Sequence, residues 1–169
     1  MTLEDFVEVR AIEQLKYRYM RAVDTHNWDL MADCFAENAN VWYGKGMYAF
    51  EGRDKILEFF RSVIIPSFVS SHIAVHPEIS ITGPSTASGI WRLQDIVHFT
   101  SANPEAKESE IKGGEKMEGA AYYYDEYSKI SGNWVIQSTG YVRIFESTTR
   151  PDYSGDQHLK TEPSLGVRE

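Results

Sequence analysis

The sequence predicts a single α+β domain, in which helices come first and a sheet of antiparallel strands follows. The strongest apolar patterns before residue 66 recur at three- and four-residue steps, which indicates amphipathic helices. From His72 onward apolar and polar residues alternate, as in half-buried strands. The length of 169 residues suits one core and leaves no room for two. The early helices are therefore expected to cover one face of the sheet.

The first two helices are predicted at the N-terminus. Apolar residues follow the helical period from Phe6 to Val23 without Pro or Gly, and this helix is expected to end near Asp24. Asn27 is a candidate N-cap for a short second helix. The residues expected to face inward from that short helix are Trp28, Met31, Cys34 and Phe35.

A hairpin and a third helix come next in the chain. The hairpin is predicted between residues 41–43 and 47–50, with Gly44-Lys-Gly46 as its turn. The third helix is predicted over Arg53–Ile65, because Pro66 cannot continue a helix.

The second half of the chain is predicted to form the main strands. Turn signals at Gly83-Pro84, Asn103-Pro104 and Ser131-Gly-Asn133 separate them. Residues 1–147 are expected to form the domain, and the polar residues 148–169 an irregular tail. The four expected strands are His72–Ile81, Thr86–Thr100, Glu115–Ser128 and Trp134–Phe145.

In the first of these strands, His72–Ile81, the alternation of apolar and polar residues is inconsistent between the two halves. A regular strand would place His72 on the face opposite to Ile79 and Ile81. A bulge at His76-Pro77 would reset the alternation and bring His72 onto the apolar face. We expect that irregularity.

The composition excludes several classes of partner. The formal net charge is −8 and no run of Lys or Arg occurs, so nucleic acid is not an expected partner. No signal peptide or membrane-spanning apolar run is found, so no membrane partner is expected. Cys34 is the sole cysteine, which fits a reducing compartment. We expect a cytoplasmic protein.

No cofactor or metal is predicted. The sequence contains no phosphate-binding loop and no dinucleotide glycine fingerprint. His72 and His76 lie in a predicted strand, where four residues span about 13 Å, which is too far for one ion. A lone cysteine also excludes paired-cysteine zinc sites.

Asp95 is a carboxylate in an unexpected place. It interrupts an apolar strand face that includes Trp91 and Leu93. An unpaired carboxylate facing a core is costly, so it needs a partner, water or a pocket. Asp95 therefore either lines a ligand pocket or serves only as an anchor, for example by pairing with Arg143.

Asp24 is the second such carboxylate. At a helix C-terminus it meets the negative pole of the helix dipole, at a cost of about 0.3–1 kcal/mol. It could cap the next helix, or it could bind a histidine inside the fold. A carboxylate that holds His72 would fix the imidazole tautomer and leave the other nitrogen as a base near neutral pH.

Two phenols are candidates for binding a carbonyl oxygen. Tyr19 and Tyr43 could donate such a hydrogen bond, although most of the 10 tyrosines are expected to be ordinary core or interface residues. In an ideal helix Tyr19 and Asp24 lie about 140° apart around the axis. The two can therefore share a pocket only if the helix end bends or unwinds.

Six motifs of the sequence resemble those of a known family. They are Ala11–Asp24, Asn27-Trp-Asp29, Cys34–Ala39, His72-x-x-x-x-Pro-Glu-Ile79, Trp91-x-Leu-x-Asp95 and Thr139–Ile144. With these motifs the chain resembles the SnoaL-like proteins of the nuclear transport factor 2-like superfamily. The resemblance extends to about Glu146, and among characterised members it is greatest to the bile acid 7-alpha-dehydratases. Scytalone dehydratases and hexachlorocyclohexane dehydrochlorinases are more distant. The loop 101–115 and the tail after Glu146 depart from the bile-acid enzymes.

This resemblance implies a cone-shaped α+β barrel, in which a strongly curved mixed sheet wraps around the N-terminal helices and a deep pocket lies between them. It implies His72 as the catalytic base, Asp24 as the partner that orients it, and Tyr19 as a donor to the substrate carbonyl. Further substrate-binding groups are implied at Tyr43, Asp95 and Arg143.

The sequence thus predicts a cofactor-independent lyase that carries out β-elimination on a hydrophobic cyclic carbonyl compound, steroid-like or from an aromatic pathway. Two alternatives stay open. One is an isomerase or cyclase that uses the same proton abstraction. The other is a non-catalytic protein, either a small-molecule binder or one like the small subunits of ring-hydroxylating dioxygenases.

The resemblance also bears on the oligomeric state. The family's open sheet face usually packs on a symmetry mate, so we expect a homo-oligomer, a dimer or a trimer.

Overall fold

The computed structural model describes residues 2–99 and 114–149, and it confirms the α+β expectation. Its helices are α1 (Leu3–Asp24), α2 (Trp28–Cys34) and α3 (Arg53–Val63), with a short 3-10 turn, η1, at Gly44–Gly46. The strands are β1 (Phe35–Tyr43), β2 (Tyr48–Glu51), β3 (Phe68–Gly83), β4 (Thr86–Phe99), β5 (Lys116–Ile130) and β6 (Asn133–Thr149). None of the helices in the described ranges is long and apolar enough to span a membrane.

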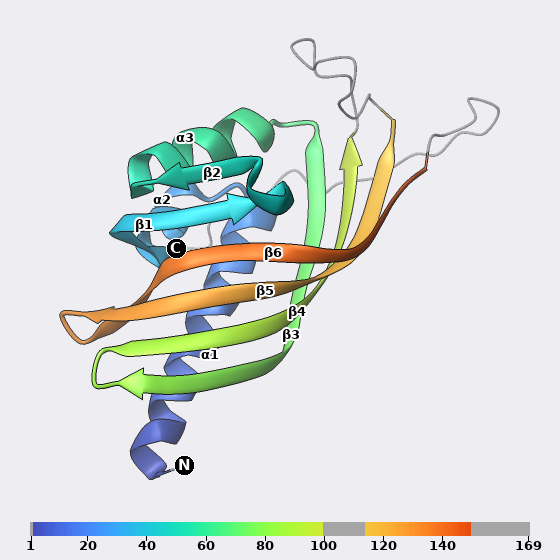
Figure 1. The fold of residues 1–169 in the computed structure, drawn as a ribbon. Coiled ribbons are helices and arrows are strands. Elements are labelled where there is room, and N and C mark those ends of the chain that lie inside the picture. Colours follow the sequence, from blue (N-terminus) through green and yellow to red (C-terminus); the bar gives the residue numbers. More distant parts are fainter. Residues whose placement is uncertain (1, 100–113, 150–169) are drawn as a thin grey trace.

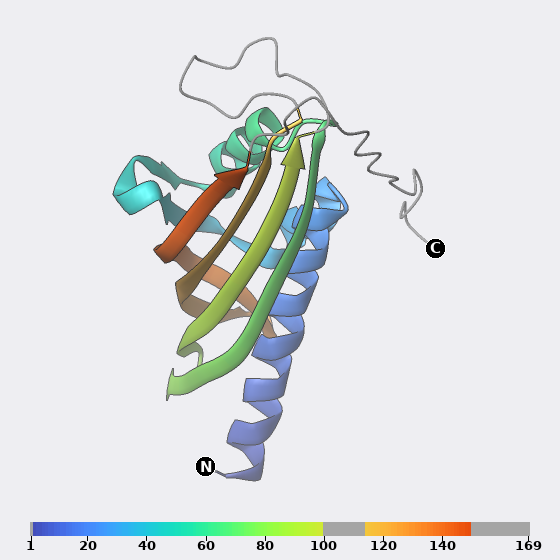
Figure 2. The ribbon, with the colours of Figure 1, turned by 90° about the vertical axis from the view of Figure 1, so that its right-hand side faces the viewer.

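The six strands form one curved, mixed sheet in the order β2-β1-β6-β5-β4-β3. Strands β3 to β6 pair antiparallel in sequence order, as expected, whereas β1 pairs parallel to β6. The sheet curves along the length of α1, and α2 and α3 lie near the C-terminal end of that helix (Figures 1 and 2). This arrangement confirms the expected curved sheet around the N-terminal helices.

The helix ends agree closely with the local signals. Helix α1 ends at Asp24, as predicted, and α2 begins after Asn27, whose side chain accepts a hydrogen bond from the Leu30 backbone N–H. Phe35 was expected in α2 but is the first residue of β1, where it pairs with Ile136 of β6. The pairing of Phe35 with Ile136, 101 positions away in the sequence, ends the helix at Cys34. The local sequence pattern holds no information about such a distant contact.

Two of the main strands, β3 and β6, are longer than predicted. Strand β3 begins at Phe68, and β6 continues to Thr149 because its last residues pair with the start of β5. Two expectations lie outside the described residues: the turn at Asn103-Pro104 and the tail beyond Thr149.

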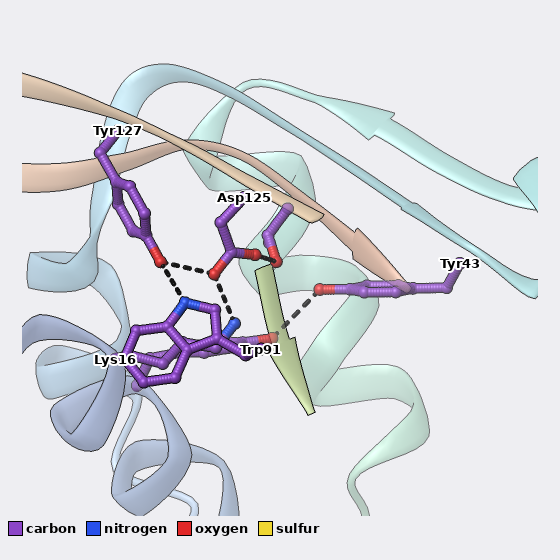
Figure 3. Close-up of polar contacts among 7 residues, drawn as sticks. Lys16, Tyr43, Trp91, Asp125 and Tyr127 are labelled. Atoms are coloured by element: carbon purple, nitrogen blue, oxygen red, sulfur yellow. Dashed lines mark hydrogen bonds and ion pairs between the residues drawn. The ribbon is translucent and has the colours of Figure 1, made fainter. Parts of the chain in front are cut away.

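A buried ion pair holds α1 against the sheet (Figure 3). Lys16 is fully buried, and its Nζ lies 2.7 Å from Asp125 Oδ2 on β5. Tyr127 and Thr139 donate hydrogen bonds of 2.6 Å to the same carboxylate, and the Trp91 indole donates to the Tyr127 hydroxyl at 2.8 Å. Burial lowers the pKa of Lys16, and the charge of Asp125 opposes that shift. Each polar group in this cluster has a partner, which is the condition under which buried charge is tolerated.

Removal of one partner should therefore destabilise the fold strongly. We expect Asp125→Ala to lower the free energy of unfolding by about 3–5 kcal/mol, because it leaves the Lys16 ammonium buried without a counter-charge. Guanidinium unfolding followed by circular dichroism measures this value. The matched control is Glu118→Ala, which removes the exposed partner of Lys116 and should cost about 0–1 kcal/mol. Equal losses in the two variants would contradict this role of the buried pair.

Candidate active site

A cavity of about 570 Å³ lies between α1, α3 and the inner face of strands β3 to β6. Most of its wall is aromatic or aliphatic. Among the described residues, its polar groups are phenols, one imidazole, one arginine and a few carboxyl or hydroxyl groups. The polar residues of its wall are Tyr19, Tyr43, Tyr48, Ser62, His72, Asp95, Tyr123, Tyr141, Arg143 and Glu146. The sequence-predicted site residues are among them, except Asp24.

Asp24 and His72 form a hydrogen-bonded pair at one side of this cavity. Asp24 Oδ1 lies 2.7 Å from His72 Nδ1 and also accepts a hydrogen bond from Ser70 Oγ. Asp24 Oδ2 accepts from the His72 backbone N–H at 2.9 Å. These donors compensate for the position of Asp24 at the negative end of the helix dipole. Asn27 is the cap of α2, so the alternative that Asp24 caps this helix is wrong.

The pair is oriented so that the histidine, and not the aspartate, reaches the cavity. The His72 side chain is 12% exposed and lines the cavity wall, whereas Asp24 lies behind it. An ionised carboxylate can only accept, so the neutral imidazole carries its proton on Nδ1. The nitrogen left to act on a ligand is then Nε2, with an unshared electron pair.

A bulge in β3 produces this orientation, as expected from the sequence. The register with β4 shifts between Val75 and Glu78, and His76 has a φ of 52°. Ile79 and Ile81 pack against the core from the same side of the strand as His72. The extra residue thus reconciles the two halves of β3.

The phenols of Tyr19 and Tyr43 meet in the cavity wall. Their hydroxyl oxygens lie 3.1 Å apart, and burial raises the pKa of each well above its usual range. Burial raises the pKa of Tyr123 in the same way. These groups therefore stay protonated at neutral pH and can donate hydrogen bonds. Because Asp24 is not part of the wall, the 140° separation from Tyr19 requires no unwinding of α1.

Asp95 lines the cavity and is also paired with Arg143, so it combines the two alternatives that its position in the sequence left open. The Arg143 guanidinium donates two hydrogen bonds to it, at 2.6 and 2.7 Å. Asp95 is only 2% exposed and lies directly opposite His72 on the neighbouring strand. Burial lowers the pKa of Arg143, but the hydrogen bonds to Asp95 and the charges of Tyr141, Asp95 and Glu146 together outweigh this effect, and the net shift of the pKa is upward. A side chain at Gly119 would clash with this pair, because a Cβ there would lie 2.7 Å from the guanidinium.

The sequence reasoning missed two groups that shape the site, Tyr141 and Lys16. Tyr123 belongs to the run Tyr122-Tyr-Tyr124, which offers further phenols in the sequence, and its ring lines the cavity 5.6 Å from that of Tyr141. Lys16 lies 3.5 Å above the Tyr123 ring on the side of the buried cluster. A signal for Lys16 was present, since it falls on the same apolar helix stripe as Ile12 and Tyr19.

The described parts of the chain hold no group of three or more His, Cys, Asp or Glu side chains that could bind a metal. His72 points to Asp24, whereas His76 is exposed at the bulge. The two histidines therefore do not share a site.

Comparison with known proteins places the chain in a family. The model of the SnoaL-like domain matches residues 4–140. The chain belongs to the SnoaL-like family. The narrower resemblance to the bile acid 7-alpha-dehydratases stays a prediction.

Solved structures share the fold of this SnoaL-like protein. A scytalone dehydratase-like protein from Novosphingobium aromaticivorans is 21% identical, covers 100% of both chains and has a TM-score of 0.74. A hexachlorocyclohexane dehydrochlorinase from Novosphingobium barchaimii is 16% identical over 94% of this chain and 99% of its own, with a TM-score of 0.75. A protein from Nostoc punctiforme with a cystatin-like fold is 16% identical over 85% and 93%, with a TM-score of 0.60. At these identities the likeness shows the fold, which is cystatin-like and agrees with the expected barrel.

The bulge that turns His72 inward should tolerate glycine and reject β-branched residues. His76 is exposed and has a positive φ, which glycine adopts freely and valine does not. We expect His76→Gly to keep or raise the melting temperature and His76→Val to lower the free energy of unfolding by about 1–2 kcal/mol. Thermal and guanidinium unfolding of the two variants measure the difference. Greater stability of the valine variant would show that the bulge is absent.

Proposed function

We propose that this SnoaL-like protein is a cofactor-independent lyase that eliminates water, or a similar leaving group, from a hydrophobic cyclic carbonyl compound. The observation that supports this most is the Asp24–His72 pair, joined at 2.7 Å, with the imidazole in the wall of a largely apolar cavity. Two proteins of similar fold are named for elimination reactions, one as a scytalone dehydratase and the other as a hexachlorocyclohexane dehydrochlorinase. Their names are consistent with the proposal.

The first step is proton abstraction beside the carbonyl. His72 Nε2 takes a proton from the carbon next to the substrate carbonyl, and the electron pair of that C–H bond forms an enolate. Asp24 stabilises the resulting imidazolium through the Nδ1–H bond. Tyr19, whose hydroxyl lies beside that of Tyr43, donates a hydrogen bond to the enolate oxygen.

The second step is loss of the leaving group. The enolate collapses to a carbon–carbon double bond conjugated with the restored carbonyl, and the bond to the β-hydroxyl breaks with its electron pair. The imidazolium returns its proton to the departing hydroxyl, which leaves as water and regenerates neutral His72. No external oxidant or reductant is needed. General acid-base help of about 10²–10⁴-fold suits a proton already activated by a carbonyl.

Asp95 and Arg143 complete the polar side of the cavity. Asp95 lies opposite His72, and Arg143 donates two hydrogen bonds to that carboxylate. Tyr43, Asp95 and Arg143 are proposed to bind the polar end of the substrate, while the aromatic wall holds its rings.

Two alternatives differ in how well the geometry supports them. A non-catalytic binder, or a protein like the dioxygenase small subunits, needs no histidine–aspartate pair at a cavity, so the contact at 2.7 Å favours an enzyme. An isomerase or cyclase would use the same base and the same phenols. It stays the second candidate, because the pair supports proton abstraction and does not specify the fate of the enolate.

Homo-oligomerisation and a cytoplasmic location stay predictions. Support for the former comes from exposed apolar side chains on the outer face of the sheet. These are Ile73, Val75, Tyr124, Val142 and Ile144.

The base assignment is tested on a panel of cyclic β-hydroxy ketones, by monitoring the ultraviolet absorbance of the conjugated product. We expect His72→Ala to lower kcat by about 10²–10⁴-fold, because proton abstraction then depends on water. Asp24→Asn should lower kcat as well, because the amide cannot stabilise the imidazolium. The control is His76→Gly, on the same strand but exposed, which should stay within about twofold of wild type. Near-wild-type turnover by a folded His72→Ala protein would rule the assignment out.

A further inference from the structure

We propose that the cavity takes an uncharged, ring-containing ligand and rejects carboxylates and phosphates, because a carboxylate of the protein already pairs with the guanidinium of its described wall. This inference rests on the proposed function only in taking this cavity as the substrate site. It adds the charge class of the substrate, which neither the fold nor the eliminating pair specifies.

The arginine of the cavity is already engaged by carboxylates. Arg143 Nη1 and Nη2 donate to the two oxygens of Asp95. Arg143 Nε is buried and lies 3.3 Å from Glu146 Oε2, although it makes no hydrogen bond with the described residues. The face of the guanidinium packs on the Tyr141 ring, with its carbon 4.6 Å from the ring centroid. The two terminal nitrogens that arginine would use end-on for a substrate carboxylate are therefore occupied by a residue of the protein.

Lys16, which lies near the cavity, cannot bind an anion in place of Arg143. Lys16 is fully buried, lies behind the ring of Tyr123 and is paired with Asp125. Within residues 2–99 and 114–149 no lysine lines the cavity. An anion in the cavity could not reach the Lys16 ammonium.

The described wall holds more carboxylates than guanidinium groups. Asp95 and Glu146 face the cavity together with Arg143, so its described wall carries one more carboxylate than guanidinium. Asp95 is nearly fully buried and lies opposite His72, where the reactive end of a substrate would sit. A ligand carboxylate placed there would lose its hydration and meet a like charge.

The same wall suits a neutral oxygen and flat rings. The phenols of Tyr19, Tyr43 and Tyr123 stay protonated because burial raises their pKa values, so they offer hydrogen bonds to a carbonyl or hydroxyl oxygen. The rings of Tyr43 and Tyr141, with centroids 5.2 Å apart, form part of an aromatic wall that also includes Phe59. Such rings favour stacking with a planar or polycyclic ligand.

A matched pair of probes tests the charge class without any turnover. The probes are 2-acetonaphthone, which is neutral, and 2-naphthoate, which has the same rings and is ionised at neutral pH. Their dissociation constants are measured by isothermal titration calorimetry with the full chain. We expect wild type to bind the ketone at least about tenfold more tightly, a difference of about 1.4 kcal/mol.

Asp95→Asn should reduce or remove this preference, because it releases two donors of Arg143 and removes a negative charge. We expect naphthoate to bind at least about tenfold more tightly to this variant than to wild type, and the ketone to change by less than about threefold. The control is Asp95→Asn combined with Arg143→Gln, which keeps the first change but removes the cation. It should prefer the ketone again.

Three results would overturn the proposal: wild type binds naphthoate as tightly as the ketone, wild type binds neither probe, or folded Asp95→Asn gains no affinity for naphthoate. If Asp95→Asn does not fold, the wild-type ratio and Glu146→Gln, which removes the half-exposed carboxylate, keep the test decisive. Naphthoate should then bind Glu146→Gln more tightly than wild type. His72→Ala should keep the wild-type preference, so a wrong base assignment and a wrong charge class give different results.

Discussion

The buried ion pair between Lys16 and Asp125 is the constraint on which the site depends. A lysine that is fully buried must keep its carboxylate partner, so α1 can have only one rotation and one position along β5. With that rotation Tyr19, one turn further along the helix, faces the cavity. Asp24, two turns from Lys16, reaches β3 at His72. The cluster therefore positions two of the proposed functional groups without touching a substrate.

The two carboxylates at the cavity are likewise stabilised by hydrogen-bond donors of the protein. Asp24 would be unfavourable at a helix C-terminus, and the donors of β3 compensate it; Asp95 would be unfavourable on an apolar strand face, and Arg143 compensates it. In each case the charge is satisfied within the protein. The groups left for a ligand are the Nε2 of His72 and a set of neutral phenols, a combination that suits proton abstraction from an uncharged carbonyl compound.

Local patterns predicted much of this molecule, and long-range pairing accounts for the features that they did not predict. The helical period of residues 6–23 and the turn signals indicated α1 and the hairpins, and the inconsistent alternation around His76 indicated the bulge. The parallel pairing of β1 with β6 joins distant segments, and no local period reports it. The contact between Lys16 and Asp125 spans 109 positions, so the place of Lys16 on an apolar helix stripe does not identify its partner. The site residues that break a pattern could be predicted, and one that fits its pattern, Tyr141, could not.

The central claim is that Asp24 holds His72 with its proton on Nδ1 and leaves Nε2 to act in the cavity. Long-range ¹H–¹⁵N spectra of protein labelled at its 5 histidines test it most directly. We expect Nδ1 to carry the proton in the neutral form of the His72 ring, and a shift of its Nε2 resonance when 2-acetonaphthone is added, with the resonances of exposed His76 unchanged. A His72 ring with its proton on Nε2, or an Nε2 resonance that does not respond to a ligand bound in the cavity, would contradict the claim.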